Sequence, residues 1–398
     1  NNTAPVAATV NTGGGGAGGA ADTAGLPGAA GTVIFAYPTS SITAKGGRKT
    51  RTPDGRFANQ FNTSGTLTVG GPTFHTIVPS EDFDILTYTG NDSNDRDITG
   101  LSFKPDLVWI KRRNSSEPHA LYDSSRGPNK QLSTDSNGAQ ATNSGAYLGM
   151  SAFLSDGFNV GNNGGTNRAP NNYVAYCWKA NGGTTTSNGD GDITSTVQAN
   201  QAFGFSITTY TNNGNNSARV GHGLGTTPKV VLIKKYGTSA SWHLMTTVID
   251  GSFDDFILNS TSAPSNSSLT APTSTTFAAE SGGSGETMIC YAFADVAGHQ
   301  KFGTYTGTGN AGQAITTGFR PGFILIKSTV GSDNWRLYDT TRGITDGGFL
   351  EPNRTDAEDT SNAPALTITD TGFEIAAGGV SNGDNANGNA YFYWAIAN

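Results

Sequence analysis

The chain has 398 residues, of which only 14% are charged and 55 are glycine, and its formal net charge is −7 at pH 7. Long solvated helices need many charged residues on their outer faces, so this composition argues against a helical protein. The acidic balance argues against nucleic-acid binding, because neutralising phosphates needs a basic surface. The sequence contains no apolar run of about 18 residues, so we expect no membrane insertion.

The first 31 residues are a glycine-rich, low-complexity segment that includes the run Gly13–Gly19. Such a composition cannot bury enough apolar surface to fold alone. The segment is either a flexible linker or extended chain that only glycine allows to pack closely at a crowded axis. The sequence begins with Asn1 and has no basic-then-apolar leader, so we expect a processed chain or part of a longer one. Residues 32–80 follow as a small β segment that opens with the apolar run 33–37.

From about residue 83 the sequence repeats itself three times. Each copy has a Thr-Tyr-Thr strand, then a proline followed at once by an apolar strand that ends in Ile-Lys, and finally an aromatic strand. The three prolines are Pro105, Pro228 and Pro321. The last aromatic residues of the copies are Trp178, Phe293 and Trp394. The proline and the last aromatic residue are 73 positions apart in copies one and three and 65 apart in copy two. This spacing predicts three tandem modules.

The fold class expected from this pattern is all-β, with tandem antiparallel sandwich or jelly-roll-like modules. Each module has several short β-forming runs separated by turn residues, and continuous apolar strands such as 107–110 are expected to be buried on both faces. The predicted boundaries are module 1 at 83–180, a Gly/Thr/Ser-rich linker at 181–199, a divergent module 2 at 200–296 and module 3 at 299–398. Whether the modules are separate sandwiches or share sheets stays open at this stage.

Motifs that carry chemistry are missing from the sequence. It has no nucleophile elbow, no His-Glu-x-x-His, no phosphate-binding loop and no dinucleotide fingerprint. The two cysteines, Cys177 and Cys290, are too few for a disulfide framework or a four-ligand zinc site. We therefore expect neither an enzyme nor a cofactor. With 31 acidic residues some carboxylates will lie close together, so a hidden glycan hydrolase site stays an alternative.

Two sets of charged residues have a structural and a functional interpretation. Asp123/Arg126 and Asp339/Arg342 recur at matching positions of copies one and three, and repetition favours an ion pair that fixes a turn over an active site. The acidic run Asn91–Asp97 and the triplet Asp190-Gly191-Asp192 offer oxygen ligands for calcium. Both lack the pattern of a calcium-binding loop, so we interpret them as solvated turns.

Possible ligand contacts lie at one matching position of the three modules. Copy two has Trp242-His243 there, copy three has Trp335-Arg336, and copy one has His119. An aromatic face beside a hydrogen-bond donor is a common way to hold a sugar. Neighbouring residues of a strand face opposite ways, so one member of each pair is expected in the core. Packing is the alternative to ligand contact, and the loops 127–147 and 161–172 are equally suited to recognition.

A family resemblance rests on the longest of these motifs. The succession 87–90, 98–111, Tyr122–Gly127, 155–158 and Tyr173–Ala180 resembles a module of bacteriophage tail and fibre proteins, many of them from marine phages. Copy three resembles the same module, and the glycine-rich start is similar to segments of phage fibres. Copy two departs from it at Thr246-Thr247-Val248. The resemblance implies a virion structural or adhesion role and supplies no catalytic residues.

The function expected from these observations is that of a tail fibre or receptor-binding adhesin in the virion. Such a protein would bind a host cell-surface glycan or protein, contact other virion proteins and assemble as a homotrimer. Weak single-site binding would gain orders of magnitude from such multivalency. Two alternatives come from other classes. One is a capsid- or tail-decorating protein without receptor binding, and the other is a secreted protein that binds or degrades polysaccharide.

Overall fold

The computed structural model describes residues 81–397 except 145–147, 281, 344–347, 361–365 and 376–382, together with short elements before residue 81. The chain divides into two compact units, residues 1–76 and 77–398. In the first unit β1, β4 and β3 form an antiparallel sheet, and β2 pairs with β5. These strands are Val33–Tyr37 (β1), Thr43–Lys45 (β2), Arg48–Arg51 (β3), Phe57–Phe61 (β4) and Thr68–Gly70 (β5). Residues 1–31 lie outside the described residues.

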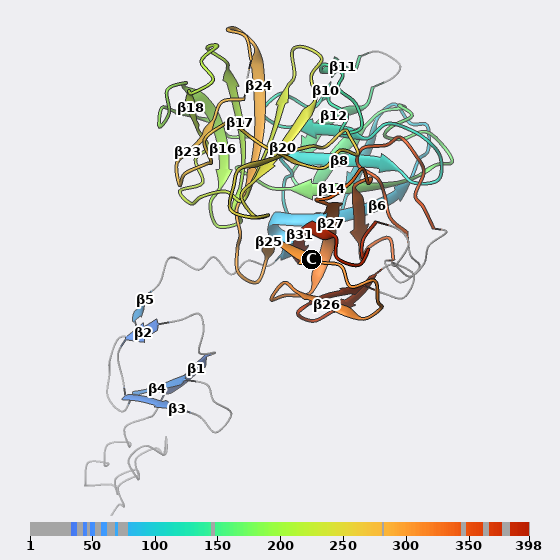
Figure 1. Cartoon of the computed structure of the whole chain (residues 1–398). Helices are drawn as coiled ribbons and strands as arrows, with labels where there is room; N and C mark the ends of the chain where they lie inside the picture. The colour runs from blue at the N-terminus through green and yellow to red at the C-terminus, as the bar shows by residue number, and fades with distance from the viewer. Residues whose placement is uncertain are drawn as a thin grey trace, which may run out of the picture. The chain divides into compact units, whose positions relative to one another are not determined.

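The second unit confirms the predicted all-β class (Figure 1). After the short helix α1 (Pro79–Asp82), its described elements are antiparallel strands arranged in several sheets. The strand Leu107–Arg112 is buried along nearly its whole length, as its continuous apolar sequence predicts.

Modules 1 and 3 share one topology. Each has a main sheet of four strands and a second sheet of three. In module 1 the main sheet is β6 (Phe83–Thr89), β14 (Asn172–Trp178), β8 (Leu107–Arg112) and β9 (Ala120–Asp123), and the second is β12 (Met150–Leu154), β13 (Gly157–Val160) and β7 (Arg96–Thr99). In module 3 the main sheet is β25 (Gln300–Thr306), β31 (Ala390–Ala397), β27 (Pro321–Ser328) and β28 (Arg336–Asp339), and the second is β26 (Gln313–Thr316), β30 (Gly372–Ile375) and β29 (Leu366–Thr369). The short strands β10 (Lys130–Gln131) and β11 (Ala141–Thr142) pair beside module 1.

Module 2 keeps the same centre but extends it at both edges. Its main sheet has eight strands, and a separate pair covers one face. The main sheet is β15 (Thr186–Asn188), β16 (Ser195–Asn200), β17 (Phe205–Thr211), β24 (Thr287–Phe293), β19 (Val230–Lys235), β20 (Trp242–Thr246), β21 (Asp254–Ile257) and β22 (Ser265–Asn266), and the pair is β18 (Arg219–Gly221) and β23 (Thr276–Ala278). Residues 181–199, expected to be a linker, therefore contain β15 and most of β16. Ser195 and Val197 are buried while Thr196 between them is exposed, and this alternation lets a polar segment join the sheet.

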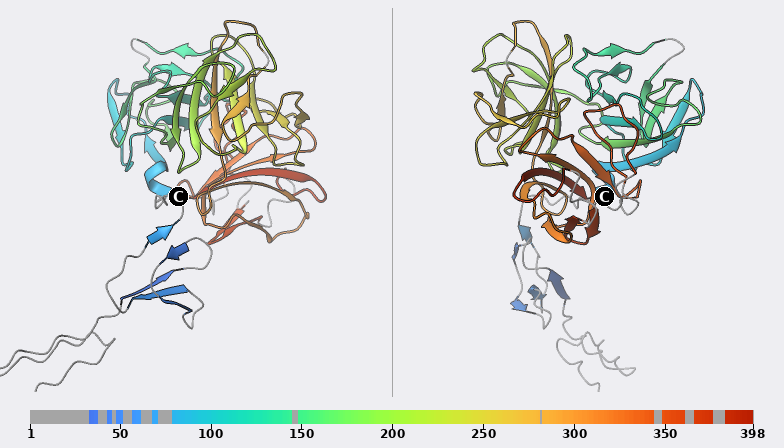
Figure 2. Two further views of the ribbon diagram at one scale, coloured as in Figure 1. Left: turned by 90° about the vertical axis from the view of Figure 1, so that its left-hand side faces the viewer. Right: turned by 45° about the vertical axis from the view of Figure 1, so that its right-hand side comes forward.

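The three modules are separate sandwiches that meet on one common core. Along β14, Tyr173, Ala175 and Cys177 face the second sheet of module 1, whereas Tyr176 and Trp178 face a central cluster. The equivalent strands β24 and β31 divide their side chains in the same way. The central cluster thus holds aromatic and aliphatic residues from all three modules, which group around it in Figure 2. Burying each large apolar side chain contributes about 1.5–3 kcal/mol, so the shared core makes the modules one folding unit.

The strand register corrects one equivalence drawn from spacing. Leu107, two residues after the module 1 proline, pairs with Trp178, but the matching Phe323 of module 3 pairs with Ile396. Trp394 pairs with Leu325 and so is the counterpart of Tyr176, which pairs with Trp109. Matching Trp394 with Trp178 was therefore wrong by two residues. Module 3 has two more residues between its proline and its closing strand, and the equal spacing of the last aromatic residues concealed them.

Candidate functional site

Three of the five residues expected to contact a ligand are buried. Trp242 and Trp335 have no exposed surface, and His119 is 1% exposed. Trp242 Nε1 donates to the Ser133 carbonyl of module 1 at 2.8 Å. His119 Nδ1 accepts a hydrogen bond from Trp109 Nε1 at 2.9 Å, so its Nε2 carries the proton toward the Glu351 carbonyl of module 3 at 3.1 Å. These side chains pack between modules, which agrees with the packing interpretation and not with ligand contact.

The other two residues, His243 and Arg336, lie on the opposite face of their strands and are partly exposed. His243 Nδ1 lies 2.9 Å from the Asp255 carboxylate. Burial lowers the pKa of His243, but the hydrogen bond to Asp255 and nearby carboxylates outweigh it, so the net direction is upward. Arg336 pairs with the buried Asp384 at 2.9 Å. Each donor is thus already engaged by a carboxylate within its own module.

A buried lysine crosses each interface between modules. These are the lysines of the repeated Ile-Lys motif, and each is at most 1% exposed: Lys111, Lys234 and Lys327. Each ammonium donates to a backbone carbonyl of the next module. The bonds are Lys111 Nζ to Thr355 O at 2.8 Å, Lys234 Nζ to Asn137 O at 3.2 Å and Lys327 Nζ to Thr261 O at 3.1 Å. Module 1 therefore reaches module 3, module 2 reaches module 1, and module 3 reaches module 2, which closes a ring.

The hydrogen bonds of the three lysines to carbonyls of neighbouring modules indicate a structural role. Burial lowers the pKa of each from 10.5 to about 8. A lysine with a lowered pKa can serve as a nucleophile where a substrate reaches it. None of the three lysines is among the residues that line the surface hollows beside Thr186 and beside Tyr88. The sequence carried a signal for this role, namely a cation repeated at the end of three otherwise apolar strands, but not the partner each cation finds.

A second buried polar set joins modules 2 and 1. Arg126 donates to Asp123 from its backbone nitrogen at 2.8 Å and from Nε at 2.6 Å, with both side chains nearly inaccessible. Tyr291 of module 2 donates its hydroxyl to the same carboxylate at 2.7 Å. Burial alone would lower the pKa of Arg126, but the Asp123 charge outweighs it and raises the pKa. The pair holds the turn after β9, as the sequence repetition predicted, and it also anchors a neighbouring module.

The same set recurs between modules 1 and 3. Tyr176 donates to Asp339 at 2.7 Å, and Asp339 is paired with Arg342. Arg342 also contacts Glu358, so this copy holds a second carboxylate. The third interface, between modules 3 and 2, has other residues at these positions: Trp394 for the tyrosine, Thr246 for the aspartate and Ile249 for the arginine. Tyrosine, aspartate and arginine are therefore replaced together there.

The acidic turn Asn91–Asp97 is held by hydrogen bonds within the turn and by two asparagines from outside it. Asn91 Oδ1 accepts from Ser93 N at 3.0 Å and from Asn167 Nδ2 at 2.9 Å. Asp95 and Asp97 both accept from the Asn159 amide at 2.7 Å. Within the described part of the chain, no group of three or more His, Cys, Asp or Glu side chains is placed to hold a metal ion. A search of the same residues for a helix long and apolar enough to cross a bilayer finds none.

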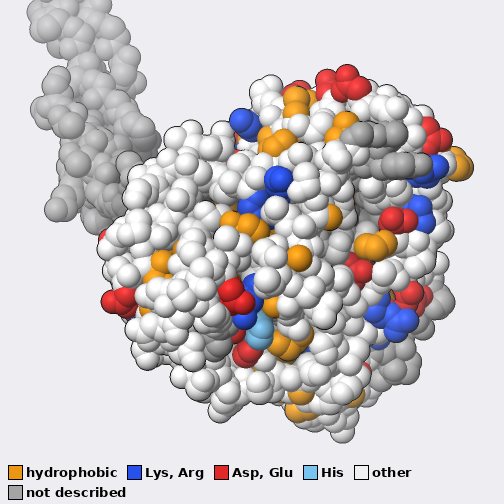
Figure 3. All heavy atoms as spheres, turned by 90° about the horizontal axis from the view of Figure 1, so that it is seen from above, with side chains coloured by type: hydrophobic (Ala, Val, Ile, Leu, Met, Phe, Trp, Pro, Cys, Tyr) orange, Lys and Arg blue, Asp and Glu red, His pale blue; other side chains and the backbone are white. Residues whose placement is uncertain are grey.

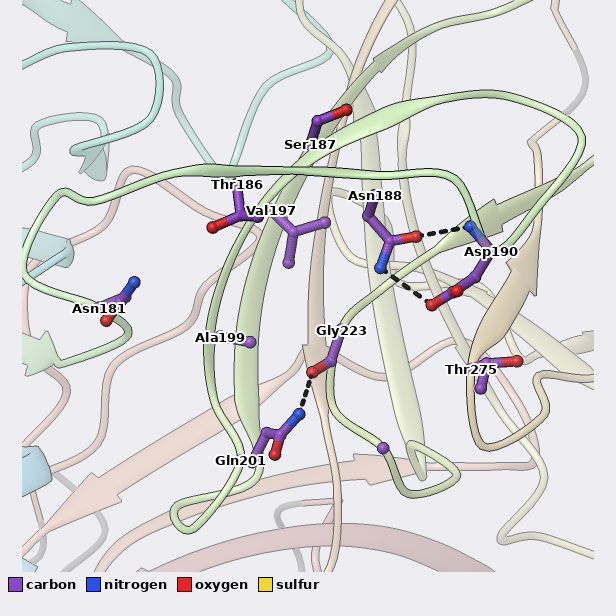
Figure 4. Close-up of a pocket in the computed structure, with 11 residues that line it drawn as sticks. Asn181, Thr186, Ser187, Asn188, Asp190, Val197, Ala199, Gln201, Gly223 and Thr275 are labelled. Atoms are coloured by element: carbon purple, nitrogen blue, oxygen red, sulfur yellow. Dashed lines mark hydrogen bonds between the residues drawn. The ribbon is translucent and has the colours of Figure 1, made fainter.

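The described residues of the second unit line at least two surface hollows. One has a volume of about 290 Å³ and lies beside Tyr88, Arg113 and Tyr173 in module 1. The other has a volume of about 350 Å³ and is lined mainly by polar residues of the module 2 extension (Figure 4). On the face seen in Figure 3, charged side chains of both signs are scattered among uncharged ones. The larger hollow is the candidate binding site of the molecule.

Comparison with known proteins adds one finding. Residues 78–398 match a family model described as Domain of unknown function (DUF7483). No curated protein and no solved structure matches the chain. The match starts at the beginning of the second compact unit and includes all three modules. The family thus corresponds to the whole shared-core body and not to a single module.

Proposed function

We propose that this chain, which belongs to the DUF7483 family, is a structural protein of a bacteriophage particle. In this proposal it is a tail-fibre or receptor-binding component that attaches the virion to a bacterial surface glycan or protein. The observation that carries the proposal is the ring of three sandwiches closed on one core and tied by buried lysines. Such a body is a rigid scaffold on which surface loops and hollows are held in place for recognition.

The motifs that resemble phage fibre modules support the same proposal. The segment Tyr122–Gly127 supplies the buried ion pair of module 1, and Tyr173–Ala180 supplies one strand of the shared core. The apolar strand that ends at Lys111 supplies an inter-module bond. The resembling residues are thus those that build the scaffold, and the recognition surface is left to the parts that differ.

A homotrimer is part of the proposal. The unit 77–398 already closes its large apolar faces upon one another, so we assign the contacts between chains to residues 1–76. The glycine-rich composition there suits close packing of several chains. Light scattering on the full chain in mild buffer tests this. A mass near three times the 41.1 kDa of the chain supports the trimer, and the mass of a single chain contradicts it.

Attachment is tested with the full chain carrying a fluorescent label. The labelled protein is mixed with a panel of marine bacteria, the cells are sedimented, and the bound label is measured. The measurement is repeated with each strain's purified surface polysaccharide added as a competitor. It is repeated again with cells that were treated with protease. Saturable binding to at least one strain, without loss of polysaccharide viscosity, supports an adhesin. Loss of viscosity would instead indicate a polysaccharide-degrading enzyme. Binding only to purified virions would indicate a decorating protein.

A further inference from the structure

We propose that the larger hollow, formed by β15, β16 and the loop after β18, binds a neutral sugar unit of a surface polysaccharide. This inference rests on the proposed attachment role and deepens it by naming the site and the ligand class. The hollow belongs to one of the two edges at which the main sheet of module 2 is longer than those of its partners. The described main sheets of modules 1 and 3 have four strands, whereas β15 and β16 extend the edge of module 2.

The extension is fixed to the body of module 2, so the hollow is formed before a ligand arrives. Ile193, between its two strands, is buried in the module 2 core. Ser195 donates its hydroxyl to the Gly221 carbonyl at 2.9 Å, and the Asp192 carboxylate accepts from Arg219 N at 2.8 Å. A preformed site avoids the entropic cost of ordering loops on binding.

The floor of the hollow is small and aliphatic. Val197 and Ala199 alternate along β16 on one face, and Thr186 of β15 lies opposite Val197 on that face. Gly223 has a φ of +72°, and a Cβ atom there would lie 2.8 Å from the Val197 side chain. Only glycine therefore lets this loop lie so close to the floor. The volume of about 350 Å³ falls in the range of roughly 300–1,000 Å³ seen for small-molecule sites.

The walls offer neutral groups that both donate and accept hydrogen bonds. They include the amides of Asn181, Asn188 and Gln201 and the hydroxyls of Thr186 and Thr275. Figure 4 shows Asn188 bonded to Asp190 and Gln201 bonded to the Gly223 carbonyl, which fixes the directions of the remaining amide groups. A ring carrying several hydroxyls matches amides and hydroxyls, and its C–H face suits the aliphatic floor.

The lining residues also argue against other ligand classes. They include no lysine, arginine or histidine, so an anionic ligand would find no countercharge. They include no aromatic ring on which a base could stack. Asp190 is the one carboxylate among them, too few for a divalent cation that prefers six or more oxygen ligands. The lining therefore fits a neutral polyhydroxylated ligand better than an anion, a base or a divalent cation.

The first test fills the hollow in the full chain. Thr186→Trp places an indole over the floor, and Thr196→Trp is the matched control, because Thr196 is exposed on the other face of the adjacent strand. Saturation-transfer NMR is recorded with a panel of neutral hexoses, deoxyhexoses and N-acetylhexosamines, and with uronic acids for comparison. We expect transfer to at least one neutral sugar from wild type and from Thr196→Trp, and at least a fivefold loss in Thr186→Trp.

Three results would overturn the site: no transfer to any neutral sugar, equal transfer from Thr186→Trp, or transfer to uronic acids alone. Gln201→Ala adds no bulk to an exposed position and guards against misfolding of the tryptophan variant. Losing one hydrogen bond of about 1 kcal/mol predicts roughly fivefold weaker binding for it. Unchanged affinity in Gln201→Ala would count against the site as well.

The cell-attachment assay separates this inference from the proposed function. If wild type attaches to cells but binds no neutral sugar, the hollow is not the site and the attachment role stands. If wild type binds a sugar through the hollow but attaches to no strain, the site stands and the proposed role fails. Loss of both sugar binding and attachment in Thr186→Trp, with both kept in Thr196→Trp, supports the two together.

Discussion

Two interfaces of the ring differ at equivalent positions. The interface between modules 2 and 1 has a buried charged site there, and the interface between modules 3 and 2 does not. In the first, Tyr291 donates to Asp123, which is paired with Arg126 in a buried site. In the second, the equivalent positions hold Trp394, Thr246 and Ile249, and the site is largely apolar. Both interfaces nevertheless keep a buried lysine that donates to a carbonyl of the next module.

The comparison distinguishes contacts that all three interfaces share from contacts that can be replaced. The lysine bond is common to all three interfaces, whereas the tyrosine, aspartate and arginine occur in two. A buried charge left without its partner is strongly destabilising, whereas replacing a whole buried ion pair by apolar groups is often neutral or stabilising. This explains why the third interface differs at all three positions at once rather than at one.

The largest effect is expected for Asp123→Ala. It leaves the Arg126 guanidinium buried without its carboxylate, which costs about 3–5 kcal/mol of unfolding free energy. The matched change in the third interface, Thr246→Val, removes two neutral hydrogen bonds. The hydroxyl donates to the Lys229 carbonyl and accepts from Val248 N, so the loss is expected to cost about 1–2 kcal/mol. Urea unfolding of both variants measures the difference. Equal losses would show that the two interfaces do not differ in the way described.

Rebuilding the charged set in the third interface sharpens the comparison. Thr246→Asp alone buries an unpaired carboxylate and is expected to cost about 2–4 kcal/mol. Adding Ile249→Arg supplies the partner three residues later, as Arg126 does for Asp123. The double variant is expected to recover about 1–3 kcal/mol relative to the sum of the single variants. Strict additivity in a double-mutant cycle would mean that the two positions are not coupled.

The inter-module hydroxyls are expected to contribute less. Tyr291→Phe and Tyr176→Phe each remove one hydrogen bond to a buried carboxylate, at a cost of about 1.5–3 kcal/mol. Tyr393→Phe is the control, because Tyr393 belongs to the second-sheet cluster of module 3 and not to the central one. If Tyr393→Phe lowers the unfolding free energy as much as the two test variants do, the interface hydroxyls have no special role.

The last effect concerns pH. Burial lowers the pKa of Lys234 from 10.5 to about 8, so between pH 8 and 10 the unfolded chain binds more protons at this residue than the folded one. Its contribution to stability therefore rises with pH in that window. Burial raises the pKa of Cys177 and Cys290, and these groups act in the opposite sense. The unfolding free energy is therefore measured against pH for wild type and for Lys234→Met, and the two slopes are compared. The slope of Lys234→Met should be smaller by the equivalent of up to one bound proton. Parallel profiles would contradict it.

Much of the scaffold was predictable because its signals repeat. The proline, the Ile-Lys strand and the Asp/Arg pair recur at fixed spacing, and they gave the modules, the all-β class and the structural role of Asp123 and Arg126. The shared core was not predictable, because burial of both faces of 107–110 does not say what covers the second face. That partner comes from the other two modules, which lie far away in the sequence.

The candidate sites were harder to predict for the same reason. Trp242 and His119 carry an aromatic or imidazole group beside a polar one, a pattern that fits a sugar site and an interface equally well. Both side chains bond to backbone carbonyls of other modules, which shows that they belong to an interface. Residues 181–199 had the composition of a linker, and only pairing with β17 turned them into strands that enclose a hollow.

Carrying the three modules on one polypeptide has a genetic consequence. In a ring of three identical chains, every substitution appears three times around the axis, and a change that suits one position must be tolerated at all of them. In this chain, codons for Thr246, Ile249 and Trp394, and for the strands β15 and β16, could change in one module while the other two kept the interface intact. A fused ring can therefore acquire a new surface feature at one position without the scaffold having to accommodate it three times.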